Sequence, residues 1–243
     1  MHDVLQRVDN AVRGAQRPAP RLVAVSKTRT AAEVAALAAV LRLACPGQAP
    51  AFGENYVQEA AAKMAELAHS RIEWHLIGHL QSNKAAQAAT LFDWVQTVDR
   101  AKLVSLLARH RPPARGPLNV LIQVNINEEA GKHGCSPAEA DALAARIVAQ
   151  PQLALRGLMA IPAPDPDPGR RRAAFGEMRR LYERLQQAHA GVDTLSMGMS
   201  DDLELAIAEG ATMVRVGTAL FGPRSRESAI GNRESDEPAS DAS

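Results

Sequence analysis

The hydrophobic positions of this chain alternate between two kinds of segment. Short runs of β-branched and apolar residues recur, and Ala- and Leu-rich segments with apolar spacing near 3.6 residues follow them. This alternation predicts repeated strand–helix units and a parallel sheet. Eight runs have the pattern of a strand, at residues 22–26, 51–54, 74–78, 94–98, 120–126, 155–161, 194–198 and 213–217.

Eight such units predict a single α/β domain, a closed (β/α)8 barrel of the TIM type, preceded by one extra amphipathic helix at 4–13. A doubly wound sheet usually stops at about five to seven strands and gives no reason for an eighth. We expect the barrel to occupy residues 1–222. The remaining residues, 223–243, are polar and poor in large apolar side chains, which predicts a disordered tail.

Charge and composition exclude several classes of protein. The formal net charge is +1 and the basic residues are spread along the chain, so nucleic acid and anionic membranes are not expected partners. No stretch approaches the roughly 18 apolar residues of a membrane span, and the first residues lack the apolar core of a leader peptide, so we expect a cytoplasmic protein. The two cysteines do not form a disulfide framework, and the seven histidines show no ligand spacing, so no metal site is predicted.

A lysine closes the first strand run. The segment LVAVSK ends at Lys27, and the following Thr-Arg-Thr opens a helix with Glu33 in its early turns. A lysine at the carboxyl end of a barrel strand points into the barrel mouth, where its amine can form a Schiff base with an aldehyde once burial beside other cations lowers its pKa. The alternative is a lysine that extends from the strand end into solvent.

The segment SMGMSDDLELAIAEG, at 196–210, is the first of two phosphate-binding candidates. Gly198 and Ser200 lead from a strand into a helix whose first turn is predicted to begin at Asp201. The unpaired amides of a helix start suit a phosphate. The alternative is that Ser200 only caps the helix, and a phosphate site requires Asp201 and Asp202 to point away.

The segment MVRVGTALFG, at 213–222, is the second candidate. Strand alternation places Arg215 and Gly217 on the face opposite the two valines, so Arg215 is expected to project into the barrel. Gly217 and Thr218 end the last strand, where barrels commonly bind phosphate. The alternative is a structural Arg215 paired with a carboxylate in the lower barrel.

Polar side chains also follow the second and third strand runs. FGENYVQE supplies Asn55, and HLIGHLQSNK supplies His79, Ser82 and Asn83. Because the carboxyl ends of the strands meet at one face, these residues are expected to line the same barrel mouth. Helix capping is the alternative explanation for each of them.

Taken together, six motifs resemble the pyridoxal phosphate homeostasis protein family in order and spacing, from about residue 4 to residue 222. They are AVSKTRT, FGENYVQE, WHLIGHLQSNK, VNINEEAGKHG, GLMAIP and SMGMSDDLELAIAEGATMVRVGTALFG. The resemblance implies a barrel like the N-terminal domain of alanine racemase, known as fold type III. It also implies pyridoxal 5′-phosphate (PLP) as the cofactor and a monomeric protein.

The resemblance also implies a role for individual residues. Lys27 matches the lysine that holds PLP as an internal aldimine, and Arg215 matches the arginine that faces the pyridine nitrogen. Lys132 matches a second lysine in the loop after the fifth strand, for handing the cofactor over, although a lysine in so polar a loop is usually only solvated. The other matches are Ser200, Gly217 and Thr218 to the phosphate cradle, and Asn55 and His79 to positions near the ring.

These residues favour a carrier over an enzyme. An arginine at the pyridine nitrogen disfavours its protonation, and an unprotonated ring is a poor electron sink. Racemases of this fold take a second base, a tyrosine, from a further domain, and here Tyr56 and Tyr182 are both poorly placed for that role. We therefore predict a non-catalytic protein that buffers PLP and supplies it to apo-enzymes. The alternatives are a small amino-acid racemase using Lys27 with water or Tyr56, and a Schiff-base aldolase acting on a sugar phosphate.

Overall fold

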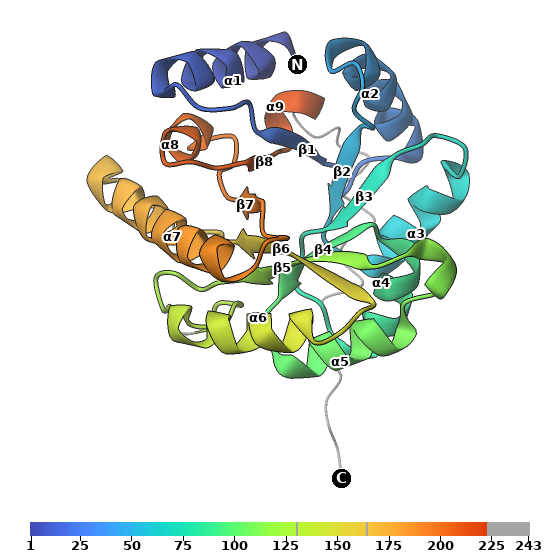
Figure 1. Cartoon of the computed structure of the whole chain (residues 1–243). Helices are drawn as coiled ribbons and strands as arrows, with labels where there is room; N and C mark the ends of the chain where they lie inside the picture. Colours follow the sequence, from blue (N-terminus) through green and yellow to red (C-terminus); the bar gives the residue numbers. More distant parts are fainter. Residues whose placement is uncertain (130, 164, 223–243) are drawn as a thin grey trace.

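Eight parallel strands close into a barrel in the computed structural model, which describes residues 1–129, 131–163 and 165–222 (Figure 1). Each strand pairs with its neighbours in chain order, and β8 pairs with β1 to complete the ring. The predicted (β/α)8 barrel is therefore confirmed. The strands are β1 Arg21–Val25, β2 Ala51–Glu54, β3 Glu73–Leu76, β4 Trp94–Val98, β5 Leu118–Gln123, β6 Leu153–Met159, β7 Thr194–Ser196 and β8 Met213–Val216.

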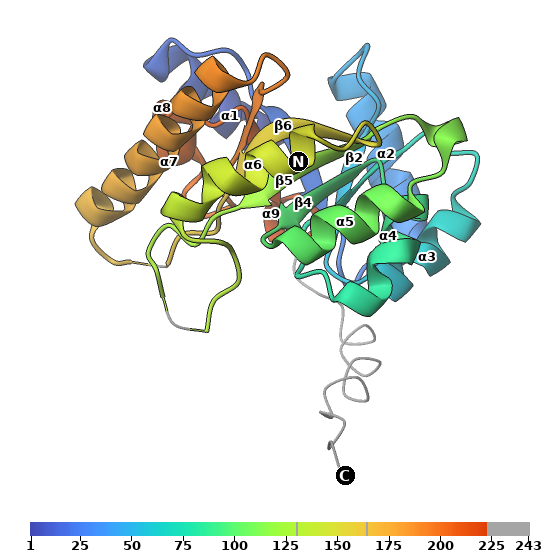
Figure 2. The same cartoon turned by 60° about the horizontal axis from the view of Figure 1, so that its bottom comes forward.

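Helices surround the strands (Figures 1 and 2). The extra helix predicted at 4–13 is present and extends two residues further at each end; it lies beside α8, where Arg7 pairs with Glu204 at 2.6 Å. The α-helices are α1 His2–Ala15, α2 Ala31–Ala44, α3 Val57–Glu66, α4 Ala85–Leu91, α5 Ala101–His110, α6 Ala140–Val148, α7 Pro168–Ala188, α8 Leu203–Ala208 and α9 Thr218–Phe221. The described residues also form the 3₁₀ turns η1 Ser82–Lys84, η2 Pro113–Arg115 and η3 Pro137–Glu139.

Several strands end earlier than their apolar runs predict. The fifth run was expected to be strand to residue 126, but β5 ends at Gln123, because Val124 leaves the ladder and makes only an isolated bridge with Cys135. The third run was expected to reach residue 78, but β3 ends at Leu76. Gly78 there lies so close to the Asn55 backbone that a Cβ would overlap it. The loops that carry polar groups thus begin inside the apolar runs.

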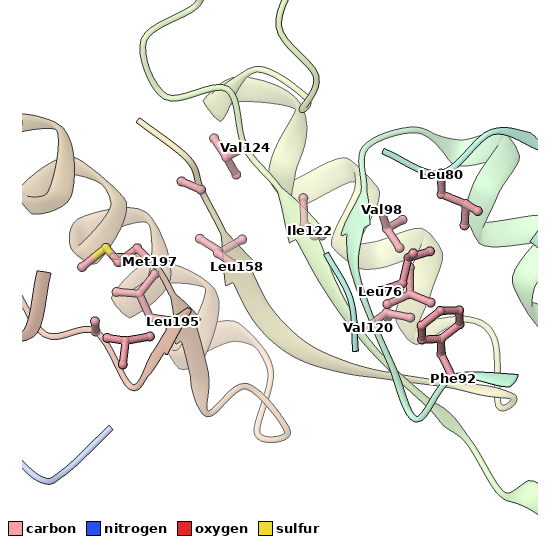
Figure 3. Packing of buried hydrophobic residues seen from close by; sticks show 14 of the residues in the cluster. Leu76, Leu80, Phe92, Val98, Val120, Ile122, Val124, Leu158, Leu195 and Met197 are labelled. Carbon is pink, nitrogen blue, oxygen red and sulfur yellow. The ribbon is translucent and has the colours of Figure 1, made fainter. Parts of the chain in front are cut away.

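The core has two layers, one on each side of the strands. Val120 and Ile122 of β5 face outward, into the large cluster between strands and helices that Figure 3 shows together with Leu76, Leu158 and Leu195. Leu121, between them, faces the barrel interior. Complete burial of one such side chain stabilises the fold by about 1.5–3 kcal/mol. The interior cluster consists of Val23, Ala51, Trp94, Leu121, Met159 and Met213.

Two further predictions concern the cysteines and membrane-spanning helices. Cys45 and Cys135 are both free thiols. In the part of the chain that the structure describes, no helix is both long and apolar enough to cross a membrane. The tail predicted at 223–243 lies outside the described residues.

Candidate functional site

Lys27 lies in the turn after β1, two residues beyond the last strand residue Val25. Val23, two positions before Val25, packs in the barrel interior, so alternation places Lys27 on the interior side of the strand line. The helix predicted after Thr-Arg-Thr is present. Thr30 caps α2 with its side chain, and Glu33 completes the capping box by accepting from the Thr30 amide at 2.8 Å.

A buried ionic cluster holds the backbone on both sides of Lys27 through hydrogen bonds. It consists of Lys63, Glu54 and Glu59, and we call it the Lys63 clamp. Lys63 Nζ donates to the Ser26 carbonyl (2.7 Å), to Glu54 Oε1 (2.8 Å) and to Glu59 Oε1 (2.7 Å). Glu54 also accepts from Ser26 Oγ, and Glu59 accepts from the Thr28 amide, each at 2.5 Å. Burial raises the pKa of Glu54, and Lys63 opposes that shift. The clamp therefore fixes the turn that presents Lys27.

Sequence reasoning missed the Lys63 clamp. Glu59 and Lys63 stand four residues apart on α3, a spacing that usually marks an exposed helix pair. The signal that a buried partner was needed is Glu54, a charged residue at the end of an otherwise apolar strand, which is 0% exposed. Buried carboxylates need a partner, and only the fold identifies Lys63 as that partner.

Arg215 projects into the barrel interior, as alternation along β8 predicts. It is 3% exposed, Nη1 donates to Ser196 Oγ at 2.6 Å, and Nη2 donates to the Ala160 carbonyl at 2.8 Å. Both acceptors are neutral, so the alternative of a salt bridge with a carboxylate in the lower barrel is wrong for the described residues. Burial lowers the pKa of Arg215 to about 10, against the opposing effect of Asp202, so the guanidinium stays charged at pH 7. Burying a charge with only neutral partners costs free energy, which is expected of a group that binds a further hydrogen-bond acceptor in the ligand complex.

The turn after β7 differs from its prediction. The helix expected from Asp201 begins at Leu203, and its N-cap is Asp202 rather than Ser200. The cause is local: Asp202 Oδ1 accepts from the Met199 amide at 2.6 Å, which holds 199–202 in a turn and delays the helix. Ser200 is therefore not occupied with capping, and its carbonyl accepts from Arg7 at 2.8 Å.

The turns after β7 and β8 lie side by side. The Arg215 amide donates to the Gly198 carbonyl at 3.0 Å, and β7 pairs with β8. Gly198 has a φ of 93° and a Cβ there would meet the Cβ of Ala206 at 2.5 Å, so only glycine fits. Gly217 precedes α9, and its carbonyl accepts from Leu220. The first amides after it, those of Thr218 and Ala219, have no earlier helical carbonyl to bind, as at any helix start.

Asn55 and His79 line a different part of the mouth, a cavity of about 780 Å³ over the ends of β2 and β3. Tyr56, Lys84 and His133 also border it. Of the described residues predicted for the site, Lys27, Ser200, Arg215, Gly217 and Thr218 do not line this cavity, and neither do Ser82 and Asn83, which belong to η1. The predicted residues thus fall into two groups, one over β2 and β3 and the other over β1, β7 and β8.

The fold also brings together three metal-ligating side chains that no sequence spacing indicated. His79, Asp99 and His133 follow β3, β4 and β5, and their ligand atoms lie within 4.8 Å of one another. The two imidazoles are stacked, with centroids 3.6 Å apart and planes 12° from parallel. Because the two ring planes are nearly parallel, the in-plane lone pairs of the two rings do not point at one common ion. Burial and His133 lower the pKa of His79. The absence of a metal stays a prediction.

Three remaining candidates have plain structural settings. Tyr56 is the N-cap residue of α3 and 61% exposed, whereas Tyr182 is buried in α7, where burial raises its pKa. Lys132 Nζ pairs with Glu129 Oε1 at 2.7 Å in the loop after β5, which Figure 2 shows projecting away from the strands. Nothing in these contacts assigns Lys132 a chemical role.

The family model described as alanine racemase, N-terminal domain, matches residues 3–225. A protein of Pseudomonas aeruginosa named pyridoxal phosphate homeostasis protein is 51% identical over 224 residues, covering 91% of this chain and 93% of the relative. PipY of Synechococcus elongatus, solved with PLP bound, is 38% identical with a TM-score of 0.73, covering 89% of this chain and 99% of PipY. An alanine racemase of Clostridium difficile, at 12% identity and a TM-score of 0.68, shares the fold over 58% of its own length.

Proposed function

Because this chain belongs to the alanine racemase N-terminal domain family, and within it to the pyridoxal phosphate homeostasis proteins, we propose that it binds PLP at the carboxyl ends of β1, β7 and β8. Arg215 is the observation that carries the proposal. It is a buried cation with two neutral partners, beside two glycine-bearing turns and on the interior side of the Lys27 strand. A purely structural role for Arg215 would not explain why the two glycine-bearing turns after β7 and β8 lie next to it.

The donor set matches the three polar parts of PLP. Bound PLP supplies an aldehyde that reacts with amines, a ring nitrogen that accepts hydrogen bonds, and a phosphate. Lys27 would hold the aldehyde carbon as a Schiff base, and Arg215 would face the ring nitrogen. Ser200, Gly217 and Thr218 would donate to the phosphate from the turns after β7 and β8. Asn55 and His79, in the neighbouring cavity over β2 and β3, would contribute from the other side of the mouth.

We infer that the protein acts as a carrier that buffers PLP and supplies it to apo-enzymes, rather than as a racemase. A protonated Arg215 opposes protonation of the ring nitrogen, which weakens the ring as an electron sink. A two-base racemase also needs a second proton-transfer group opposite Lys27. Tyr182 is buried in α7 and Tyr56 is a largely exposed helix cap, so neither tyrosine is positioned by its surroundings for that step.

Visible absorbance of the purified protein with added PLP tests the cofactor site. The wild type should show the band of a protonated Schiff base near about 420 nm. Borohydride reduction should then fix the cofactor on the peptide containing Lys27. Lys27→Ala should show neither signal, whereas Lys132→Ala, which removes an exposed lysine of the loop after β5, should keep both. No band in the wild type, or reduction products scattered over surface lysines, would overturn the proposal.

Exchange of the Cα hydrogen of amino acids tests the carrier role. In deuterated buffer with the PLP-loaded protein, we expect no exchange beyond that of free PLP, as followed by NMR. Sustained exchange that requires Lys27 and falls in Tyr56→Phe would instead establish a racemase.

A further inference from the structure

A continuous file of polar side chains crosses the barrel interior and ends on Arg215. His75 Nε2 lies 3.0 Å from Glu73 Oε1, and His75 Nδ1 lies 2.9 Å from Gln96 Nε2. Gln96 Oε1 is 2.7 Å from Ser196 Oγ, which in turn is 2.6 Å from Arg215 Nη1. His75, Gln96 and Ser196 are fully buried. We call Glu73, His75, Gln96 and Ser196 the interior relay.

The donor and acceptor groups of the interior relay determine the direction in which its hydrogen bonds run, from Arg215 to Glu73. A guanidinium can only donate, so Ser196 Oγ accepts from Arg215, and the Ser196 hydroxyl in turn donates to Gln96 Oε1. The Gln96 amide nitrogen then faces His75 and donates to Nδ1. Nδ1 is therefore unprotonated, and a neutral His75 carries its proton on Nε2. That proton is donated to Glu73, which completes the chain.

The reverse orientation fails at its far end. If the Gln96 amide were flipped, its nitrogen would donate to Ser196 and its oxygen would require a proton on His75 Nδ1. A neutral His75 would then direct the lone pair of Nε2 at the Glu73 carboxylate, which is repulsive. The contact of Gln96 Nε2 with the Met213 sulfur, at 3.1 Å, gives the second amide hydrogen an acceptor only in the unflipped orientation.

A fixed charge anchors the interior relay at the bottom of the barrel. Arg21 Nη2 donates to Glu73 Oε1 at 3.2 Å, which keeps that carboxylate ionised. In a low-dielectric interior, hydrogen bonds in one direction polarise one another, so the Glu73 charge strengthens each acceptor up to Ser196 Oγ. Within the described residues, this is the polar support that reaches the Arg215 side chain besides the Ala160 carbonyl.

A purely structural role does not account for the interior relay. The cluster beside it in the barrel interior is apolar, with Val23, Leu121 and Met159 among its members, and similar side chains would fill the space of the relay at lower desolvation cost. The polar groups instead form a single ordered path whose mouth end is Arg215. Resting on the proposed function, we propose that Glu73, His75, Gln96 and Ser196 are positioning residues that hold the Arg215 guanidinium in one orientation toward the ring nitrogen of PLP.

Substitutions that interrupt the path test the proposal without touching the cofactor. Gln96→Leu removes both central hydrogen bonds, Ser196→Ala removes the acceptor of Arg215, and Ser196→Thr keeps a hydroxyl there. Gln96→Leu and Ser196→Ala should bind PLP about ten- to a hundredfold more weakly, the loss expected for one hydrogen bond to a charged group. Ser196→Thr should retain most of the affinity. Leu121→Met, a volume-conserving change in the same interior, is the packing control.

The pH titration of the visible band separates positioning from general loosening. With Arg215 no longer held, the ring nitrogen should take up a proton at a pH about one unit or more higher than in the wild type. Ser196→Thr and Leu121→Met should titrate like the wild type. A wild type without any band refutes the proposed function, whereas a normal wild type with unchanged Gln96→Leu and Ser196→Ala refutes only the interior relay. If Gln96→Leu fails to fold, the two Ser196 variants decide.

The protein without PLP offers an independent test. Nitrogen–proton correlation NMR should show His75 as the neutral tautomer with its proton on Nε2, unchanged between about pH 6 and 8. A proton on Nδ1, or a charged imidazolium in that range, would contradict the direction of the path and overturn the proposal.

Discussion

Replacement of Lys63 by methionine removes the ammonium group that binds Ser26, Glu54 and Glu59 while keeping a side chain of similar length. Lys63 and Glu54 are 6% and 0% exposed, so water cannot replace the lost hydrogen bonds. Glu54 would keep only the Ser26 hydroxyl as a donor, and its second oxygen, Oε2, already has no hydrogen-bond partner. Breaking a buried pair from one side costs about 3–5 kcal/mol.

Protonation of Glu54 limits that cost and gives it a pH signature. Without Lys63, burial raises the Glu54 pKa further above its value in the unfolded chain. A group whose pKa is raised on folding contributes stability at low pH and loses it as pH rises through the folded value. The free energy of unfolding of Lys63→Met should therefore decrease from about pH 5 to pH 8, with a slope of up to about 1.4 kcal/mol per pH unit.

Urea unfolding followed by circular dichroism measures both effects. At pH 7 the midpoint of Lys63→Met should fall by about 1 M or more. The double variant Glu54→Gln/Lys63→Met, which removes both charges, should recover part of the loss and flatten the pH dependence. Lys132→Met, which breaks the exposed pair with Glu129, is the matched control and should change stability by less than about 1 kcal/mol. A Lys63→Met loss no larger than that of the control would refute the reasoning.

Three further predictions follow from single contacts. Gly157→Ala places a Cβ against the Thr194 carbonyl at a φ of 144° and should lower the free energy of unfolding, measured by thermal unfolding, by about 3 kcal/mol or more. Gly116→Ala, at a φ of 64° in open space, should lower it by about 1 kcal/mol. Equal losses in the two variants would contradict the steric argument. Burial, with help from nearby carboxylates, raises the pKa of the Cys135 thiol to about 12, so iodoacetamide at pH 8 should label Cys45 and leave Cys135 unmodified until the protein unfolds, as mass spectrometry will show. Burial lowers the pKa of His75, so the unfolded chain binds a proton that the folded chain does not. The free energy of unfolding should therefore fall from about pH 7 to pH 5. An unchanged pH dependence of stability in His75→Asn would exclude His75 as its source.

Local pattern predicted much of the fold. The spacing of apolar residues located all eight strands, since each strand buries its residues on both faces whichever neighbours it meets. The Thr30 and Glu33 cap was predictable for the same reason, because its contacts span three residues. Alternation along β8 likewise placed Arg215 inside the barrel. Strand ends and the start of α8 were predicted less well, because Val124, Gly78 and Asp202 take partners that the apolar pattern does not reveal.

The support around the site depended on tertiary structure. Gln96 and Ser196 are 100 residues apart in the chain, yet they share a hydrogen bond. Lys63 and Ser26 meet across 37 residues, and His79, after β3, stacks on His133, after β5, past the end of the intervening strand β4. The sequence by itself determined which residues alternate inward and which chemistry stands at the strand ends, because those depend on near neighbours along the chain. Only closure of the barrel, which fixes register between strands, decided which of these side chains touch.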